Sequence, residues 1–215
     1  GYKSLKARAE ANEAFGAELK NGKKADAQRG YEIACKEWMD VRSFGQVFAF
    51  KGSELSLGIR GPVSVQPAFS VDPIDITSMQ ITKSVNSEDK EGKSSDTMGM
   101  KHRVDFGVYI LKGSINVQLS EKTGFTEEDA EKIKEAIRTL FVNDSSSARP
   151  DGSMVMHKLY WWKHNCKIGQ YSSHKVHNSI EIKKKEGVRN PRKIEDYEII
   201  CHELPGLAVE EYEGL

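Results

Sequence analysis

The stretch ITKSVNSEDKEGKSSDTMGMKHRVDFGVYI (residues 81–110) begins and ends like a β-strand, but its middle contains almost nothing to bury. Near its end, apolar side chains alternate strictly through Val104, Phe106, Val108 and Ile110, which predicts a strand. The middle is rich in Ser, Asp, Lys and Gly, a composition typical of a solvated or disordered segment. Loops longer than about 12 to 15 residues without structure of their own are usually functional or disordered. This insertion is therefore the first candidate for a functional element, and the alternative is a plain surface loop.

On the N-terminal side of the insertion, the residue pattern predicts two helices followed by a strand. Residues 2–19 are rich in Ala, Lys and Glu, and residues 25–41 carry an apolar stripe at steps of three and four. Between residues 55 and 69 the apolar period changes to two, with a bulge or bend expected near Gly61 and Pro62. These segments predict helices that pack on a sheet.

On the C-terminal side, a strand, a helix and a further strand are predicted. Alternation over residues 104–119 predicts a long bent strand or a tight hairpin. Residues 123–141 predict a helix with a buried apolar stripe, and Thr126 with Asp129 three residues on resembles a capping box. A last strong strand is predicted within residues 154–164.

The predicted order is helix, strand, long insertion, strand, helix, strand. A ferredoxin-like or RRM-like domain has the order strand, helix, strand, strand, helix, strand, so this α+β order lacks only the opening strand. We therefore predict a single RRM-like domain over residues 1–215, with its first strand missing and a hairpin insertion at residues 76–103. Residues 180–215 are predicted to form a charged, irregular C-terminal extension with a weak strand at residues 197–204.

The composition predicts a cytoplasmic protein without a membrane partner. No apolar run approaches the roughly 18 residues that cross a bilayer, and the N-terminus shows no secretory signal. Cys35, Cys166 and Cys201 are odd in number and far apart, which favours reduced thiols over a disulfide framework.

Charge is balanced overall but unevenly distributed. The formal net charge is zero, yet residues 155–193 contain ten basic and two acidic side chains. Residues 194–215 contain seven acidic side chains and no Lys or Arg. This polarity suits a basic surface for a polyanion, an acidic end that docks on the next copy of the chain, or an ordinary solvated surface.

The sequence predicts no metal, no cofactor and no catalysis. His164, Cys166, His174 and His177 lie near one another, but the spacing lacks the paired ligands at both ends that zinc sites usually have. No nucleophile-elbow, P-loop or zinc-protease motif is present.

Several blocks of sequence, taken in order, resemble the backbone subunit of the type I-C CRISPR Cascade complex, an RRM-like member of the RAMP superfamily. The blocks are DVRSFGQVFA (40–49), GIRGPVSVQPAFSVDPIDI (58–76), ITKSVN (81–86), TMGMKHRVDFGVY (97–109), TGFTEEDAEKIKEAI (123–137) and YWWKHN (160–165). The family begins with a strand and a Gly/Asn-rich loop that are not found here, which agrees with the missing first strand.

The resemblance implies a non-catalytic subunit for antiviral defence. It would polymerise along the crRNA as a helical filament, bind the RNA backbone without regard to sequence, and leave bases free to pair with target DNA. Its partners would be crRNA, target DNA, further copies of itself and other Cascade subunits. In this family a hairpin called the thumb reaches over the neighbouring subunit, and residues 76–103 would form it.

Carried over by position, the resemblance implies RNA contacts from both the thumb and the segments before it. These residues are Arg42, Ser43, Phe44, Gln46, Arg60, Gln66, Ser70, Lys83, Met98, Met100, Lys101, His102 and Arg103. Phosphate contacts of this kind position a strand, while guide pairing supplies the specificity.

Two structural and two functional alternatives accompany these assignments. Arg42 would equally neutralise a helix C-terminus, and Phe44 would equally be core. A RAMP-type endoribonuclease is the main rival, with Asp89 or Asp96 as a loop acid and His102 as a general acid or base. The other functional alternative is a protein–protein module that uses the basic segment and the acidic tail.

Overall fold

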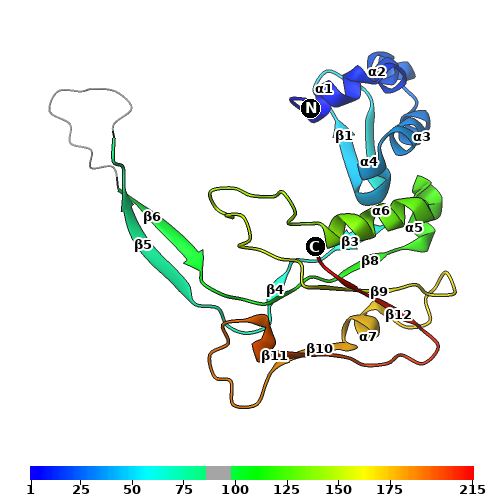
Figure 1. Cartoon of the computed structure of the whole chain (residues 1–215). Coiled ribbons are helices and arrows are strands. Elements are labelled where there is room, and N and C mark those ends of the chain that lie inside the picture. Colours follow the sequence, from blue (N-terminus) through cyan, green and yellow to red (C-terminus); the bar gives the residue numbers. More distant parts are fainter. Residues whose placement is uncertain (86–97) are drawn as a thin grey trace. The chain divides into compact units, whose positions relative to one another are not determined.

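Helices and strands are interspersed along the chain in the computed structural model, which describes residues 1–85 and 98–215 (Figure 1). The content of helix and strand confirms the predicted α+β class. The described chain divides into two units, of which unit 1 is Gly1–Val65, Gly113–Val176 and Glu203–Leu215, and unit 2 is Gln66–Lys112 and His177–His202.

The N-terminal helices of unit 1 are shorter and more numerous than the sequence predicts. Asn12 has an extended backbone that ends the first helix, and its side-chain oxygen accepts the Phe15 N–H at 2.9 Å to begin the second. Trp38 is also extended and interrupts the predicted helix over residues 25–41. The elements are α1 (Leu5–Ala11), α2 (Glu13–Lys20), η1 (Gly22–Lys24), α3 (Ala27–Glu37) and α4 (Met39–Phe44).

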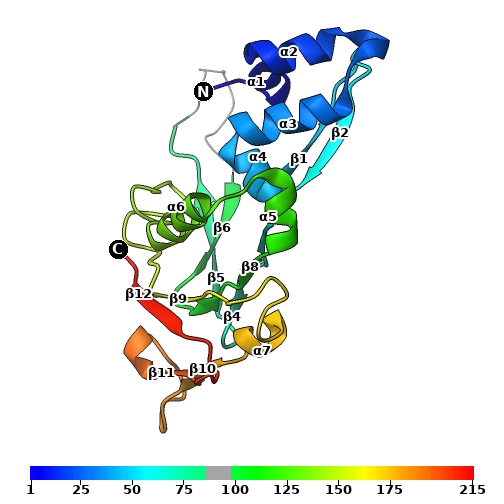
Figure 2. The ribbon, with the colours of Figure 1, turned by 90° about the vertical axis from the view of Figure 1, so that its right-hand side faces the viewer.

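These helices cover one face of an antiparallel strand pair (Figure 2). Its strands are β1 (Gly45–Ala49), which the sequence reading missed, and β2 (Ser56–Arg60). Phe48 is fully buried, with its ring centroid 4.8 Å from that of Phe15 and 5.7 Å from that of Trp38. Aromatic rings at such spacings supply much of the apolar area that a core buries.

The rest of unit 1 contains two strand pairs and three helices. They are β3 (Val63–Val65) with β8 (Gly113–Ile115), β9 (Lys158–Trp162) with β12 (Val209–Glu213), α5 (Val117–Thr123), α6 (Glu127–Arg138) and α7 (Ser173–His177), whose last residue begins a segment of unit 2. The predicted strand through Val117 and Leu119 is wrong, because Asn116 accepts the Leu119 N–H at 2.9 Å and starts a helix. The capping box of Thr126 and Asp129 is confirmed.

Unit 2 is built from three strand pairs. They are β4 (Phe69–Ser70) with β7 (Tyr109–Ile110), β5 (Ile76–Thr82) with β6 (Met98–Val104), and β10 (Ile180–Lys184) with β11 (Tyr197–Cys201), which η2 (Ile194–Asp196) precedes. Within residues 180–215, β11 confirms the strand predicted at residues 197–204, whereas the prediction that the rest is irregular is wrong, since it contains β10 and β12. The bend predicted near Gly61 and Pro62 is confirmed by the gap between β2 and β3. Every sheet in the described residues has two strands, so the RRM-like arrangement stays a prediction.

Candidate nucleic-acid interface

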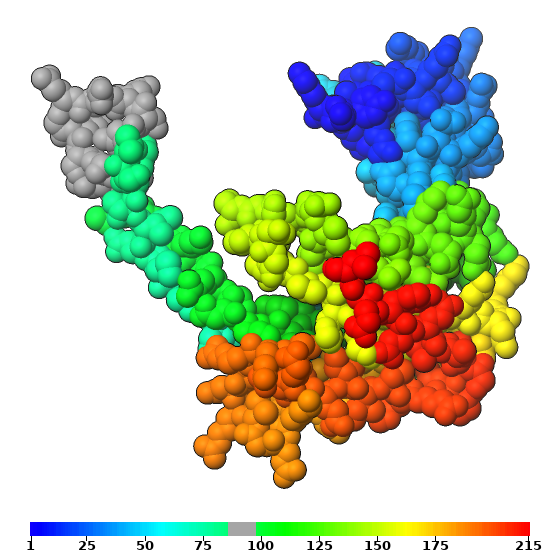
Figure 3. Space-filling model, in the orientation of Figure 1, coloured from blue at the N-terminus to red at the C-terminus, as the bar shows by residue number. Residues whose placement is uncertain are grey.

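The β5–β6 ribbon is the most exposed regular structure in the described chain. Its strands pair from Ile76 opposite Val104 to Thr82 opposite Met98, and the ribbon extends away from β4 and β7 (Figure 1). Thr77 is half-buried, and every other residue of the two strands is exposed. Figure 3 shows how narrow this ribbon is. An isolated two-stranded ribbon is marginally stable at best in water, so the exposed side chains of this one are a candidate surface for a partner.

The pairing register sorts the ribbon's side chains onto two faces, because residues directly opposite each other point the same way. We call one the methionine face; it consists of Ile76, Ser78, Gln80, Thr82, Met98, Met100, His102 and Val104. We call the other the lysine face; it consists of Thr77, Met79, Ile81, Gly99, Lys101 and Arg103. The predicted thumb contacts are therefore divided, with Met98, Met100 and His102 on one face and Lys101 and Arg103 on the other.

The methionine face combines exposed apolar side chains with local hydrogen bonds. Met98 and Met100 are 63% and 57% exposed. Ser78 Oγ and His102 Nδ1 lie 2.8 Å apart, and Gln80 Nε2 donates to Met98 Sδ at 2.6 Å. These bonds orient His102 and Met98 without burying them. Apolar side chains of this kind can wedge between bases while hydrogen-bonding neighbours hold the backbone.

The lysine face carries one engaged and one free cation. Arg103 Nε donates to Asp105 at 2.7 Å, and Thr77 Oγ1 donates to the same carboxylate at 2.6 Å. The Thr77 hydrogen bond and then the Arg103 contact lower the pKa of Asp105. Lys101 forms no ion pair with any residue that the structure describes, so its charge is available to a phosphate.

Arg42, the first of the predicted RNA contacts in unit 1, is engaged inside the protein. Its Nη2 and Nε donate to the two carboxylate oxygens of Asp129 at 2.6 and 2.8 Å. Its Nη1 reaches the carbonyls of Cys35 and Lys36. The Arg42 hydrogen bond lowers the pKa of Asp129 to about 2. Arg42 thus joins α4 to α6, and its contact with RNA stays a prediction.

Ser43 is fully buried, and its hydroxyl has no hydrogen-bond partner in the described residues. Neighbouring Phe44 is 52% exposed, so the alternative that it belongs to the core is wrong. The backbone at Gly61 crosses closely over the backbone at Ser43, a feature that we call the crossing. A Cβ built on Gly61 would lie 2.2 Å from the Ser43 carbonyl oxygen. Gly45 has φ +84°, which favours glycine. The crossing leaves Phe44 exposed at the end of β1.

The exposed face of the β1–β2 pair carries one more predicted contact. Arg60 pairs opposite Gly45 and shares this face with Val47 and Gly58, whereas Gln46 lies opposite buried Ile59. The Gln46 side-chain oxygen accepts the Val47 N–H at 2.9 Å. Arg60 therefore lies on the exposed face of the pair, opposite Gly45 and beside Gly58.

The remaining predicted contacts lie in unit 2. Gln66 is exposed and donates its main-chain N–H to the Lys112 carbonyl at 2.8 Å. Ser70 lies in β4 opposite Tyr109, and Lys83 is exposed directly after β5. The structure places Lys83 beside the ribbon and keeps Gln66 and Ser70 near the strands from which the ribbon rises.

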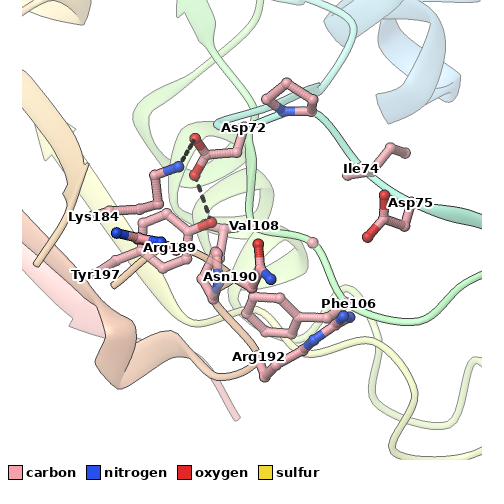
Figure 4. A pocket seen from close by; sticks show the side chains of 13 residues that line it. Asp72, Ile74, Asp75, Phe106, Val108, Lys184, Arg189, Asn190, Arg192 and Tyr197 are labelled. Atoms are coloured by element: carbon pink, nitrogen blue, oxygen red, sulfur yellow. Dashed lines mark hydrogen bonds and ion pairs between the residues drawn. The ribbon is translucent and has the colours of Figure 1, made fainter. Parts of the chain in front are cut away.

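A pocket of about 160 Å³ forms in unit 2 between residues 72–75, residues 106–108 and the segment that joins β10 to β11 (Figure 4). Asp72 Oδ2 accepts the Tyr197 hydroxyl at 2.8 Å, and Lys184 Nζ lies 3.1 Å from the other oxygen. The Tyr197 bond and then Lys184 lower the pKa of Asp72, while burial and this carboxylate raise that of Tyr197 to about 12. Arg189 and Arg192 also line the pocket. From sequence, both arginines belong to the basic segment of residues 155–193, and no site is predicted for them.

The structure describes only part of the acid and base set of the nuclease alternative. Within residues 1–85 and 98–215, no group of three His, Cys, Asp or Glu side chains is placed to hold a metal ion. Asp89 and Asp96, the acids of the nuclease alternative, lie outside the described residues. His102 forms a hydrogen bond with Ser78 and has no acidic partner among the residues that the structure describes.

A model of the family described as CRISPR-associated protein Cas7 matches residues 2–202. The chain belongs to the Cas7 family. Membership associates it with crRNA as a CRISPR backbone subunit and with other Cascade subunits. A search of curated proteins found no match. None of the helices in the described part of this Cas7-family chain has the length and apolar content that crossing a membrane requires.

Proposed function

We propose that this protein is a non-catalytic backbone subunit of a type I-C Cascade complex. In this role it polymerises along the crRNA spacer, binds the phosphate backbone and presents bases to target DNA. The ordered blocks that resemble the type I-C subunit support the subtype, and the Cas7 match supports the class. The RRM-like arrangement and the role of the β5–β6 ribbon as a thumb belong to the same proposal.

The observation that carries the proposal is the two-faced exposure of the β5–β6 ribbon. A ribbon with a packed face would contribute to the fold, but this one keeps its methionines, isoleucines and Lys101 exposed. One face offers apolar side chains with His102, and the other offers Lys101, which forms no ion pair within residues 1–85 and 98–215. Stacking or wedging against bases and binding of phosphate need these two kinds of side chain.

The division of the predicted contacts between two faces sharpens the proposal. Because Met98 and Met100 point away from Lys101, one nucleotide cannot lie flat against all three. We expect the strand to pass around the ribbon, with a displaced base against the methionine face and a phosphate against the lysine face. Residues on one face alone would then account for only part of the affinity.

The test is to mix the purified chain with a long single-stranded RNA of arbitrary sequence, then to measure particle size, image the particles and run the RNA on a gel. The proposal expects regular helical particles and intact RNA. Free chain with cut RNA would favour the RAMP endoribonuclease instead. Free chain with intact RNA would contradict filament formation.

A paired variant assigns any binding to the ribbon. Met98→Ser/Met100→Ser should lower RNA affinity about 10-fold, since burying an apolar side chain against a base is worth about 1 to 2 kcal/mol. Met154→Ser/Val155→Ser removes two exposed apolar side chains elsewhere and serves as the control. Equal loss in both variants would argue that the methionine face has no particular role.

A further inference from the structure

One side chain of β11 contacts both of the chain segments from which the β5–β6 ribbon rises. We call these segments, residues 71–75 and 105–108, the stems of the ribbon. Tyr197 is 5% exposed, and its hydroxyl donates to Asp72 Oδ2 at 2.8 Å (Figure 4). The ring of Tyr197 lies beside that of Phe106, with centroids 6.5 Å apart. Asp72 belongs to the stem before β5 and Phe106 to the stem after β6, so Tyr197 joins both stems to β11.

The Asp72 carboxylate also joins its stem to β10. Its second oxygen lies 3.1 Å from Lys184 Nζ. Lys184 pairs directly opposite Tyr197 in the register of β10 and β11, so two neighbouring strands hold one carboxylate. Hydrogen bonds to an ionised acceptor are roughly twice as strong as those between neutral groups. The contact between the stem and the β10–β11 pair is therefore a specific one.

The stems are also held to each other. A Cβ built on Gly107 would lie 3.1 Å from Ile74 Cγ2, so a glycine allows the two stems to pack this closely. Where the ribbon begins, Asp105 accepts from Thr77 Oγ1 at 2.6 Å and from Arg103 Nε at 2.7 Å, and so links one residue of each strand. The two strands therefore leave the stems as one body.

Beyond the stems, the described part of the ribbon has little packing of its own. Thr77 is half-buried, and every other residue of β5 and β6 is exposed. A two-stranded ribbon of this kind is marginally stable at best in water. Its direction therefore depends on how its stems are held.

We infer that Tyr197 is a positioning residue for the ribbon, which it holds in one direction through Asp72 and Phe106. The inference rests on the proposed function, because the ribbon is the RNA-binding element of that function. Tyr197 is buried, so it acts on RNA through the ribbon and not by contact. A ribbon that is already in place loses less conformational entropy on binding, and the apparent affinity falls with the fraction of chains in which it is correctly placed.

The first test measures the direction of the ribbon without RNA. Spin labels on a non-natural amino acid are introduced at Thr82, the last residue of β5, and at Glu195, an exposed residue of η2. Pulsed electron paramagnetic resonance then gives the distribution of distances between them. The unmodified chain should give one narrow distribution, and Tyr197→Phe, which removes only the hydroxyl, should broaden it. A broad distribution in the unmodified chain would overturn the inference.

Tyr171→Phe is the matched control. The Tyr171 hydroxyl donates to the Pro205 carbonyl at 2.8 Å, so this variant loses a hydrogen bond of the same length, but in unit 1. It should leave the distance distribution unchanged, and equal distributions in both variants would overturn the inference. Circular dichroism shows whether Tyr197→Phe is folded. If it is not, Asp72→Ala removes the same hydrogen bond from its other partner and takes its place.

The second test measures affinity for a single-stranded RNA by fluorescence anisotropy. Tyr197→Phe should lower the affinity about 5-fold, because fewer chains hold the ribbon in place, whereas Tyr171→Phe should change it by less than about 2-fold. In a chain that already carries Met98→Ser/Met100→Ser, the further loss from Tyr197→Phe should be smaller, since the two changes act through the same ribbon. Equal losses in both backgrounds would mean that Tyr197 does not act through the ribbon.

The two tests separate this inference from the proposed function. If Tyr197→Phe broadens the distance distribution but the unmodified chain binds no RNA, the proposed function fails and the role of Tyr197 in placing the ribbon stands. If the unmodified chain binds RNA and Tyr197→Phe binds it equally well, the inference fails and the proposed function stands.

Discussion

The β1–β2 and β5–β6 pairs are both antiparallel ribbons of two strands, yet only the first has a buried face. Phe48 of β1 is fully buried beneath the N-terminal helices, whereas Met98 of β6 is more than half exposed. No third strand joins either edge of either pair in the described residues. The same backbone pairing therefore serves two purposes: β1–β2 completes a core, and β5–β6 presents side chains.

The two pairs also differ in how they use arginine. Arg42, at the end of the helix that leads into β1, is 19% exposed and binds both oxygens of buried Asp129. Arg103 of β6 and its partner Asp105 are exposed. Exposed ion pairs contribute little to stability, whereas a buried carboxylate that loses its partner is costly. The Arg42–Asp129 pair therefore stabilises the fold, whereas the exposed Arg103–Asp105 pair contributes little to it.

The largest difference should come from truncating a side chain in each ribbon. Phe48→Ala should lower the free energy of unfolding by about 3 to 5 kcal/mol, because it leaves a cavity beside Phe15 and Trp38. Met100→Ala should change it by less than about 0.5 kcal/mol, because Met100 is exposed. Urea unfolding followed by tryptophan fluorescence and circular dichroism measures both. A similar loss from Met100→Ala would mean that the ribbon is packed after all.

A smaller but sharper contrast comes from adding one methyl group to each region. Gly61→Ala would place a Cβ 2.2 Å from the Ser43 carbonyl oxygen, so the backbone must shift, and we expect a loss of about 2 to 4 kcal/mol. Gly99→Ala in β6 meets only the Ile81 side chain at 3.6 Å and should be neutral or slightly stabilising. Gly58→Ala, with nothing within 4 Å, is the control in β2. If Gly61→Ala and Gly58→Ala change the free energy of unfolding equally, the close approach of Gly61 to the Ser43 carbonyl does not constrain the backbone.

The ion pair of Asp129 gives an effect of about 2 kcal/mol that depends on pH. The pKa of this carboxyl is about 2 in the folded protein and roughly 3.9 when unfolded, so ionisation stabilises the fold. The contribution is complete above about pH 4 and is lost as pH falls to about 2. Asp129→Asn should remove the contribution of this carboxyl to the pH dependence of stability and weaken its binding to Arg42. The exposed Asp105→Asn variant should leave the pH dependence of stability unchanged within error. Urea unfolding at several pH values tests this, and an unchanged pH profile in Asp129→Asn would contradict it.

The sequence predicts the helices and strands well where one periodic pattern persists. The stripe in residues 127–138 and the capping box of Thr126 and Asp129 both mark α6 correctly. Prediction from the apolar pattern fails where a single polar side chain overrides that pattern. Asn12 and Asn116 each start a helix by accepting a main-chain N–H, and apolar spacing carries no signal for that. β1 was missed because only its register opposite β2 shows that it is a strand.

The candidate site was predictable in kind but not in geometry. The mixture of Met and cationic residues at 98–103 leads to the prediction that this segment binds RNA, and strand alternation divides these residues between two faces once the register is known. The family resemblance predicts that Arg42 contacts RNA. In the structure its guanidinium binds the Asp129 carboxylate, 87 residues away in the chain. The sequence does not predict the pocket that Arg189 and Arg192 line, because residues 72–75 and 106–108 approach these arginines only in the folded chain.

The smallest expected effect separates the two cations of the lysine face. Lys101 has no ion-pair partner in the described residues, whereas Arg103 is bound to Asp105, so only Lys101 is free to neutralise a phosphate at no internal cost. Lys101→Gln should reduce the slope of log affinity against log salt by about 0.7, the value for one phosphate contact on a single strand. Arg103→Gln should reduce it less, because Asp105 already offsets that charge. Fluorescence anisotropy with a single-stranded RNA at several salt concentrations measures both slopes. Equal slopes in Lys101→Gln and the unmodified chain would remove the lysine face from the interface and leave the methionine face to account for binding.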